Sequence, residues 1–405
     1  MTVDPRAVAV IDAGWPDPTR SAGERATVDL VDALVARGDL VTIVGLGRDP
    51  REHSGLGAVL ASRGAQVHPT VGLAAVATVL DAERCGLVFV QRPGPMVRVA
   101  PVLAARPEVA VVHCGHDLHA ERLGAEAAVL GTDPRRARLL AVAERAARHA
   151  ADVTTYPSAT EAAVAEATDA PGVSTQSRVV AVPYYRLGPG DLDRGARPDS
   201  GRRGILLVGG ADHAPNRDAL AWTVAEVLPR LRRAGVDDPV TVVGDWPAAR
   251  RPRSTDGLRF TGRVDDATLR ALHHDHRLLL APLRFGAGAK RKVVAAMGLG
   301  LPVVTTAVGA RGLLVRDAGP GDGVMVADTP DALADAVRAL ADRERWRACT
   351  RAAHAAVTVV YGVDPYDRSV EITARLAGGV RDARTGFRAR ETSARGGLRD
   401  VRGTA

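Results

Sequence analysis

The stretch APLRFGAGAKRKVVAAMGLGLPVVTTAVGARGL, residues 281–313, decides the fold class of this chain. An apolar strand ends in a Gly-rich turn at 286–288, a helix follows, and a second apolar strand, PVVTT, begins at residue 302. This order of strand, tight turn, helix and strand is the repeating unit of parallel α/β sheets. The segment therefore predicts a parallel sheet that is covered by helices.

The same alternation of short apolar runs and helical stretches continues on both sides of this segment. In the first half we predict strands at 7–12, 40–45, 66–71, 87–91, 109–113, 152–156 and 179–183, with a helix over about 22–37. In the second half we predict strands at 204–210, 240–244, 258–262, 278–283, 302–306 and 323–327, with helices at about 216–234, 266–274 and 288–299 and further helices to about 355. The pattern predicts two Rossmann-like, doubly wound α/β domains that face a central cleft, where ligands of such sheets bind.

The domain boundaries follow from changes in composition. We predict a first Rossmann-like domain at 1–184, a Gly- and Pro-rich linker at 185–203 and a second Rossmann-like domain at 204–360. A helix at 361–377 is expected to cross back to the first domain, and an Arg-rich tail at 378–405 is expected to be disordered.

Net charge and composition exclude several classes of protein. The chain carries +7, of which the tail contributes +4, so the nearly balanced remainder does not favour nucleic acid as a partner. No apolar run is long enough to cross a membrane and the start shows no basic leader, so we expect a cytoplasmic protein. The three cysteines are widely spaced and lie outside any CxxC, which predicts unpaired thiols.

The lysines are the most informative charges. Of 54 basic residues only Lys290 and Lys292 are lysines, and both stand at the start of the helix that follows the Gly-rich turn. Glycines and a helix N-terminus fit a diphosphate, and we predict that Lys290, in the first turn, is its cation, since a cation there is unfavourable without an anion. Lys292 lies about 200° further around the helix, so we expect it to point elsewhere. The alternative is that both lysines are solvated.

These residues resemble a known family. RFGAG-x-K-x-K, followed by AMGLGLPVVTT and VGARGL, is similar to the signature segment of retaining glycosyltransferases of the GT-B fold, namely the family 4 and related group 1 enzymes. The resemblance extends to LLVGGADHAPNRDAL (206–220) and FTGRVDDATLRALHHDHRLLLAPLRFGAG (260–288). It also includes the loop after residue 11, VVHCGHDLHAERL (111–123) and DVTTYPSATEAAV (152–164), so it covers nearly everything except the tail.

The resemblance implies transfer of a hexosyl or related sugar from a nucleotide-diphosphate donor to an acceptor hydroxyl, with retention of configuration and without a metal or a cofactor. The acceptor stays open between a polysaccharide intermediate, a lipid and a secondary metabolite. By position, the resemblance implies catalytic roles for His116 and Lys290. It implies donor-binding roles for Gly23, Gly209, His213, Asn216, Arg263, Val264, Arg284, Phe285, Gly286, Ala287, Gly288, Ala289 and Lys290.

His116 has alternatives, because it stands in a segment with two further histidines and Cys114. Their spacing fits no closed zinc pattern without further ligands, so we expect no metal site. The remaining choices are a contact to the donor sugar and an ordinary loop histidine, with His119 as the second candidate for the sugar contact.

Two positions depart from the family pattern. Ala295 stands where members commonly carry a ribose-binding Glu, and Arg311 stands where GAEGL-type members carry Glu. The main alternative function is therefore a catalytically degenerate GT-B protein that binds or activates a partner enzyme. A sugar-nucleotide epimerase is a third reading.

The helix at about 134–150 combines five arginines with apolar residues. A weak peripheral contact with an anionic membrane is one reading of this pattern, and a solvated basic face of a Rossmann helix is the other.

Overall fold

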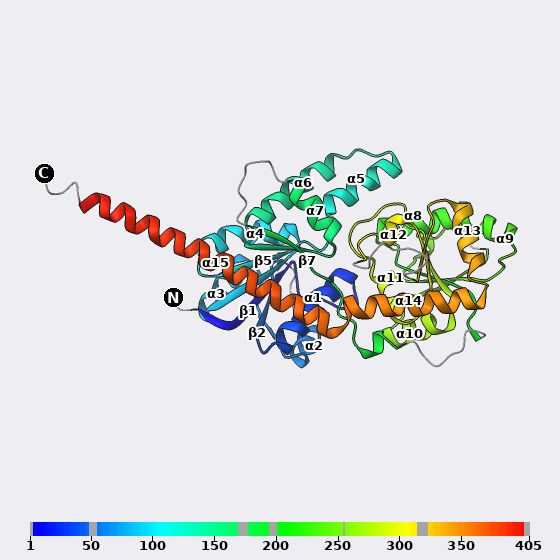
Figure 1. Cartoon of the computed structure of the whole chain (residues 1–405), viewed down its shortest axis with the longest axis horizontal. Coiled ribbons are helices and arrows are strands. Elements are labelled where there is room, and N and C mark those ends of the chain that lie inside the picture. The colour runs from blue at the N-terminus through cyan, green and yellow to red at the C-terminus, as the bar shows by residue number, and fades with distance from the viewer. Residues whose placement is uncertain are drawn as a thin grey trace. The chain divides into compact units, whose positions relative to one another are not determined.

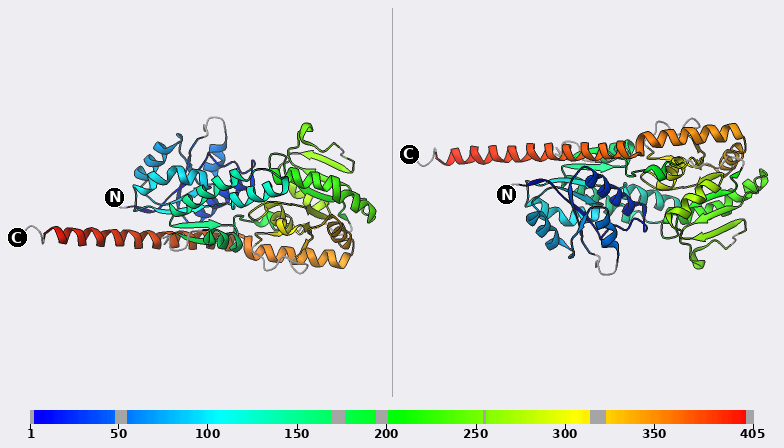
Figure 2. Two further views of the ribbon diagram at one scale, coloured as in Figure 1. Left: turned by 90° about the horizontal axis from the view of Figure 1, so that it is seen from above. Right: turned by 90° about the horizontal axis from the view of Figure 1, so that it is seen from below.

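The computed structural model describes residues 3–47, 55–168, 177–193, 201–253, 256–313 and 323–400, with side chains to residue 385. Contacts divide the chain into two compact units. The first contains Met1–His116, Leu139–Tyr184 and Tyr366–Ala405, and the second contains Asp117–Arg138 and Tyr185–Pro365. Each unit holds one parallel sheet, and helices lie on both faces of each sheet (Figures 1 and 2).

The first sheet has the strand order β3-β2-β1-β4-β5-β6-β7. Its strands are β1 Asp4–Asp12, β2 Leu40–Gly45, β3 Gln66–Val67, β4 Cys85–Gln91, β5 Ala110–Cys114, β6 Val153–Tyr156 and β7 Arg178–Ala181. The predicted strand at 66–71 is only two residues long, because Pro69 has no N–H for the ladder. The other six predicted strands are confirmed within three residues at each end, and residues of β1, β2, β4 and β5 form one apolar core.

The helices between these strands follow the predicted alternation. They are α1 Ala22–Ala36, α2 Leu56–Ser62, α3 Leu73–Ala82, α4 Pro93–Ala104, α5 His119–Leu130, α6 Arg135–His149 and α7 Ala159–Ala167. Ser21 caps α1 by accepting a hydrogen bond from the Glu24 N–H. Residues of α5 cluster with the second unit, although the sequence places them before residue 184.

The second sheet has the order β10-β9-β8-β11-β12-β13. Its strands are β8 Ile205–Val208, β9 Val240–Val243, β10 Leu258–Gly262, β11 Leu278–Ala281, β12 Val303–Thr305 and β13 Val324–Val326. Its helices are α8 Ala214–Trp222, α9 Leu228–Arg233, α10 Asp266–Asp275, α11 Arg291–Gly298, α12 Ala307–Ala310, α13 Pro330–Ala339 and α14 Arg343–Tyr361. Both sheets are parallel, so the predicted doubly wound α/β fold is confirmed.

The helix predicted over 216–234 is confirmed, and it contains a π turn. The turn, Thr223–Val227, lies between α8 and α9, and Pro229 stands in the first turn of α9. Proline cannot donate to the carbonyl four residues earlier, and a π turn accommodates the missing bond. The sequence prediction did not include this irregularity.

The tail predicted to be disordered is helical in the described residues. Helix α15 runs from Val363 to Asp400, and Arg384 fastens it to the first sheet through an ion pair of 2.8 Å with Asp152. Arg384 also donates to the carbonyls of Pro107 and Val109. Composition alone pointed to disorder because these partners lie more than 200 residues away in the sequence.

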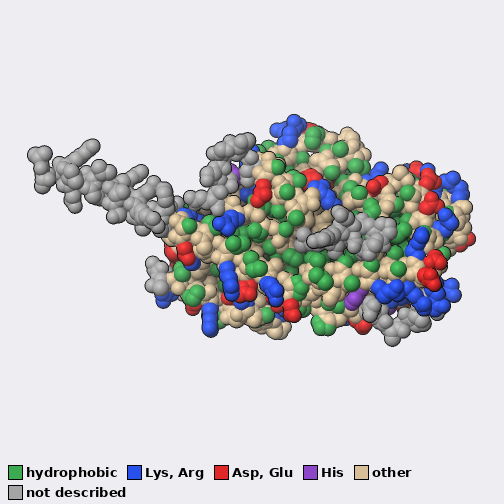
Figure 3. All heavy atoms as spheres, in the orientation of Figure 1, with side chains coloured by type: hydrophobic (Ala, Val, Ile, Leu, Met, Phe, Trp, Pro, Cys, Tyr) green, Lys and Arg blue, Asp and Glu red, His purple; other side chains and the backbone are tan. Residues whose placement is uncertain are grey.

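The surface and the thiols agree with the composition. Basic and acidic side chains are interspersed on the face that Figure 3 shows. Cys85, Cys114 and Cys349 are free and buried, and burial raises the pKa of the first two thiols to about 12. No helix among the described residues has the length and apolarity that crossing a membrane requires.

Helix α6 shows which of its residues form the basic face. Leu139 and Val142 are exposed, as are the arginines near them, but Arg148 is buried and donates to the Thr168 hydroxyl at 2.9 Å. Arg148 therefore does not belong to the solvent face. A membrane contact of this helix stays a prediction.

Candidate functional site

Two neighbouring strands of the second sheet bring the predicted donor residues to one edge. Strand β8 is followed by Gly209 and by α8, and strand β11 is followed by the loop 282–290 and by α11. β8 and β11 pair in parallel register, so both loops leave the carboxyl edge of the sheet at adjacent positions. The chain changes direction between these strands, and this is where open α/β sheets bind ligands.

Asn216 connects the two loops. Its side-chain amide donates to the Gly210 carbonyl at 3.0 Å, and its Oδ1 atom accepts a hydrogen bond of 2.6 Å from Lys292 Nζ. Gly209 has a φ of 147°, and a Cβ atom there would lie 2.5 Å from Asn216 Nδ2. Only glycine fits at position 209 while Asn216 keeps this place.

The two lysines take different positions from those predicted. Helix α11 begins at Arg291, so Lys290 is the extended residue before the helix and is not part of its first turn. Its ammonium donates to the Gly288 carbonyl at 2.5 Å. Lys292, which we expected to point elsewhere, reaches the first turn of α8 instead. Burial, and secondarily the charge of Lys290, lowers the pKa of Lys292 to about 8.

The loop itself is fixed by its neighbours. Gly286 and Gly288 have φ values of 155° and 69°, and the buried Tyr185 hydroxyl donates to the Ala289 carbonyl at 2.7 Å. Ala287 is partly exposed between the two glycines. The backbone at Ala287 is therefore partly exposed. The end of the turn at Ala289 is held by Tyr185, which belongs to the segment predicted as the linker.

Four of the predicted donor residues have other surroundings. Arg284 forms an ion pair with Asp218, with Nε to Oδ2 at 2.9 Å, and its guanidinium lies 5.7 Å from the centre of the Trp222 ring. Phe285 is 1% exposed, so its ring belongs to the core. Arg263 and Val264 follow β10, the edge strand, which β9 and β8 separate from β11.

His213 is the N-cap residue of α8 and lies near several cations. The His213 side chain is exposed, and crowding of its ring by neighbouring groups, followed by the charges of Arg122 and Lys292, lowers its pKa. The ring is therefore neutral near pH 7. Neutral His213 is available to a ligand as a hydrogen-bonding partner.

Arg311 forms an ion pair with Glu121 of α5, within the second unit. Its carbonyl is 3.4 Å from Lys290 Nζ. Arg311, which departs from the family pattern, is thus paired with Glu121, a residue that the sequence analysis did not single out. Ala295 is partly exposed on α11 and offers no carboxylate.

In the first unit, Gly23 and His116 lie close together at the carboxyl edge of the sheet. A Cβ atom on Gly23 would lie 3.4 Å from His116 Nδ1 and 3.0 Å from Nη2 of Arg92. The His116 ring contacts Gln91 Oε1 through Nε2 at 2.8 Å and packs edge-on against Tyr184. Sequence analysis missed Arg92, which is one of 52 arginines and carries no motif.

The histidines near Cys114 do not gather into a metal site. His113 is fully buried beside the Val90 carbonyl, and His119 pairs with Asp117. In the part of the chain that the structure describes, no group of three His, Cys, Asp or Glu side chains is placed to hold a metal ion.

Comparison with known protein families gives a match to the part of the second unit that contains β8 and β11. Residues 202–343 match a family model described as Glycosyl transferases group 1. This segment is similar to a group 1 glycosyltransferase domain. The resemblance predicted from residues 281–313 is thereby confirmed for the second unit.

Solved structures extend the likeness of fold to both units. Sucrose-phosphate synthase from Thermosynechococcus elongatus is 18% identical with a TM-score of 0.67, over 95% of this chain and all of that one. A glycosyltransferase from Rickettsia africae is 11% identical with a TM-score of 0.65, over 91% and 98% of the two chains. HepE of Anabaena, solved in complex with UDP, is 16% identical with a TM-score of 0.62, over 90% and 98%.

At these identities the likeness shows the fold, which is the GT-B arrangement of two Rossmann-like domains. No curated protein matches the chain. In the second unit, the Gly-rich loop, Lys292, Asn216 and His213 are the residues that the structure brings together. Gly23 and His116 belong to the first unit.

Proposed function

We propose that the chain transfers a hexosyl or related sugar from a nucleotide-diphosphate donor to an acceptor hydroxyl, with retention of configuration and without a metal. The observation that carries the proposal is the contact between Lys292 and Asn216 inside the segment that is similar to a group 1 glycosyltransferase domain. It places one of the chain's two lysines between two loops that leave the same edge of the sheet.

The chemistry of this edge suits a diphosphate leaving group. Negative charge develops on the phosphate oxygen as the glycosidic bond breaks, and fixed donors and cations lower the free energy of that charge. Lys292 and Lys290 supply the cations, and the Gly286–Gly288 turn allows an oxygen-rich group to approach the backbone. The acceptor hydroxyl attacks the anomeric carbon from the face that the leaving group departs from, and the departing phosphate oxygen takes its proton.

Each unit has a separate role in this proposal. The second unit holds the donor diphosphate, and the first unit holds the acceptor beside Gly23 and His116. HepE, which shares the fold, is solved with UDP and with UDP-glucose, so uridine donors are the first to test here.

Calorimetry with UDP-, GDP-, ADP- and TDP-sugars tests donor binding, and NMR of the product reports the anomeric configuration. We expect one nucleotide to bind with micromolar to millimolar Kd, as substrates commonly do. Lys292→Gln should weaken that binding, and Arg338→Gln, an exposed member of an ion pair on α13, is the control of equal charge change.

Two residues favour a second candidate, a degenerate protein that binds or activates another enzyme. Ala295 lacks the ribose-binding carboxylate, and Arg311 is engaged with Glu121. A well-folded sample that binds none of the four nucleotide sugars would support this candidate over sugar transfer.

A further inference from the structure

Two residues with unusual backbone conformation stand side by side on the first sheet. Arg92 directly follows β4, His116 follows β5 after Gly115, and both have a φ of 66°. β4 and β5 pair in parallel register with Gln91 opposite Cys114, so Arg92 and His116 leave neighbouring strands at the carboxyl edge, His116 one residue further along its strand. Residues with a side chain rarely adopt this conformation, and such outliers concentrate where a ligand is held.

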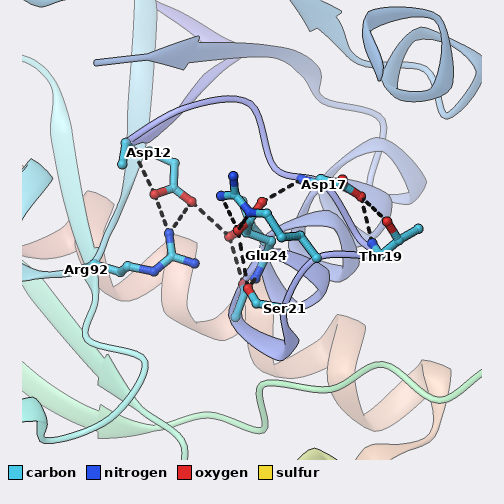
Figure 4. A network of polar contacts seen from close by, with 10 residues as sticks. Asp12, Asp17, Thr19, Ser21, Glu24 and Arg92 are labelled. Atoms are coloured by element: carbon cyan, nitrogen blue, oxygen red, sulfur yellow. Dashed lines mark hydrogen bonds and ion pairs between the residues drawn. The ribbon is translucent and has the colours of Figure 1, made fainter. Parts of the chain in front are cut away.

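Arg92 is fixed by a buried carboxylate. Its Nη1 atom contacts both oxygens of Asp12, which is 2% exposed at the end of β1 (Figure 4). Asp12 also accepts hydrogen bonds from the Ala13 N–H at 2.6 Å and from the Thr27 hydroxyl at 3.4 Å. The Asp12 carboxylate therefore accepts hydrogen bonds from three donor groups, and Nη1 is the terminal nitrogen of Arg92 that it contacts.

The other terminal nitrogen lies against Gly23, which has no side chain to cover it. A Cβ atom on Gly23 would lie 3.0 Å from Arg92 Nη2 and 3.4 Å from His116 Nδ1. All three residues are partly exposed, so a solute can reach them. The network in Figure 4 holds the loop before α1 in place, with the Asp17 N–H donating to Glu24 at 2.9 Å. Arg92 and the loop before α1 are thus each held in a fixed position by their own hydrogen bonds.

We propose that Arg92 binds an oxyanion carried by the acceptor, a phosphate or a carboxylate, through its Nη2 edge. The guanidinium is a permanent cation whose planar donors match the geometry of an oxyanion. The inference rests on the proposed function and sharpens it, because the diphosphate of the donor belongs to the second unit. It makes the acceptor an acidic molecule and Arg92 the residue that selects it.

Calorimetry with inorganic phosphate on the full-length chain, saturated with UDP so that the donor site is filled, tests the proposal. Wild type should bind phosphate, and Arg92→Gln should weaken that binding by about tenfold or more, the loss expected for a charged hydrogen bond. Arg106→Gln is the matched control. Arg106 follows α4 and forms an ion pair with Asp81, and this variant should bind phosphate as tightly as wild type does. Equal affinity in all three proteins, or no phosphate binding to wild type, overturns the proposal.

Arg92→Gln leaves Asp12 without its cation, so a second pair of variants covers a failure to fold. Asp12→Asn keeps the guanidinium and should bind phosphate at least as tightly as wild type. The double variant Asp12→Asn with Arg92→Gln removes both charges and should lose the binding. Equal phosphate affinity of these two variants contradicts the proposal.

Competition identifies which oxyanion is selected. Glucose 6-phosphate displacing phosphate indicates a phosphorylated acceptor, and glucuronate displacing it indicates an acidic sugar. Displacement by neutral glucose alone contradicts the proposal. Failure of all four nucleotides to bind contradicts the proposed function, and phosphate titration without a nucleotide then still compares Arg92→Gln with Arg106→Gln.

Discussion

Lys292 donates a 2.6 Å hydrogen bond from Nζ to Oδ1 of Asn216, which joins the helix after β11 to the helix after β8. The bond crosses between two loops that leave neighbouring strands. It holds a cation at the carboxyl edge of the second sheet before any ligand is present. The following predictions depend on this arrangement and on the contacts that support each unit.

Donor affinity should fall as the pH rises above 8. The pKa of Lys292 is lowered to about 8, so its ammonium is present below that pH and is lost as the pH rises through it. Because a diphosphate binds the cationic form, the Kd of UDP should rise about tenfold per pH unit above 8. Calorimetry between about pH 7 and 9.5 measures this change in Kd, because that range includes the pH at which Lys292 loses its charge.

Lys292→Arg provides the control for this profile. Arginine keeps its charge throughout the range, so the variant should show a flat profile. A profile that stays equally steep in Lys292→Arg would assign the pH dependence to another group.

Gly209→Ala should damage both stability and donor binding. The added methyl group would lie 2.5 Å from Asn216 Nδ2, so Asn216 and its bond to Lys292 must shift. Gly235→Ala is the matched control, because Gly235 also has a positive φ but has no atom within 4 Å of the added group. We expect Gly209→Ala to lower the free energy of unfolding by about 2 kcal/mol more than the control does. Urea denaturation measures the difference, and equal losses in the two variants count against this role of Gly209.

Arg384→Ala should destabilise the first unit strongly. Asp152 is 2% exposed, and without Arg384 its charge stays buried and lacks its cation. We expect a loss of about 3 kcal/mol in the free energy of unfolding, as for other broken buried pairs. Arg375→Ala is the control, since Arg375 of α15 pairs with Glu371 on the solvent side and such pairs contribute about 0–1 kcal/mol. Chemical denaturation that finds equal losses for both variants would show that α15 is not held by Arg384.

The second unit should lose stability in mild acid through His273. Burial lowers the pKa of this histidine to about 4, whereas the unfolded chain protonates it near 6.5. The unfolded state therefore binds more protons between these values, and the stability present above pH 6.5 is lost as the pH falls toward 4. The loss amounts to about 3 kcal/mol.

His273→Leu should reduce the slope of stability against pH in this window, as followed by thermal or urea unfolding from pH 4 to 7. His149→Leu changes an exposed ring in α6 and controls for the substitution itself. An unchanged slope in His273→Leu rules out burial of His273 as the cause.

The fold was largely predictable because the alternation of apolar strands and helices is local. β2 and β10 were predicted to the residue, since Gly or charged residues flank each apolar run. The start of α11 was misplaced by three residues because the conformation of the turn depends on a distant partner. Tyr185, more than 100 residues earlier, fixes the end of the turn through Ala289, and no local pattern reveals that bond.

Residues of the candidate site that belong to a sequence motif could be predicted. Residues whose position depends on a contact with a distant part of the chain could not. The Gly-rich loop and Asn216 carry a recognisable pattern, whereas Arg92 acquires its place from Asp12, 80 residues away in the sequence. Lys292 was set aside because it lies about 200° around the helix from Lys290. Its rarity as one of two lysines was the signal that deserved more weight. The C-terminal helix was predicted only to residue 377, and its continuation was missed for the same reason as Arg92, since Asp152 lies far from Arg384 in the sequence.

A crystal structure of the chain with a bound nucleotide sugar tests the central claim most directly, starting with UDP-glucose and proceeding through the other nucleotides that calorimetry shows to bind. The account predicts that the diphosphate lies against the Gly286–Gly288 turn, with an oxygen within hydrogen-bond distance of Lys292 Nζ. A diphosphate bound elsewhere, with the Lys292 bond to Asn216 unchanged, would contradict it.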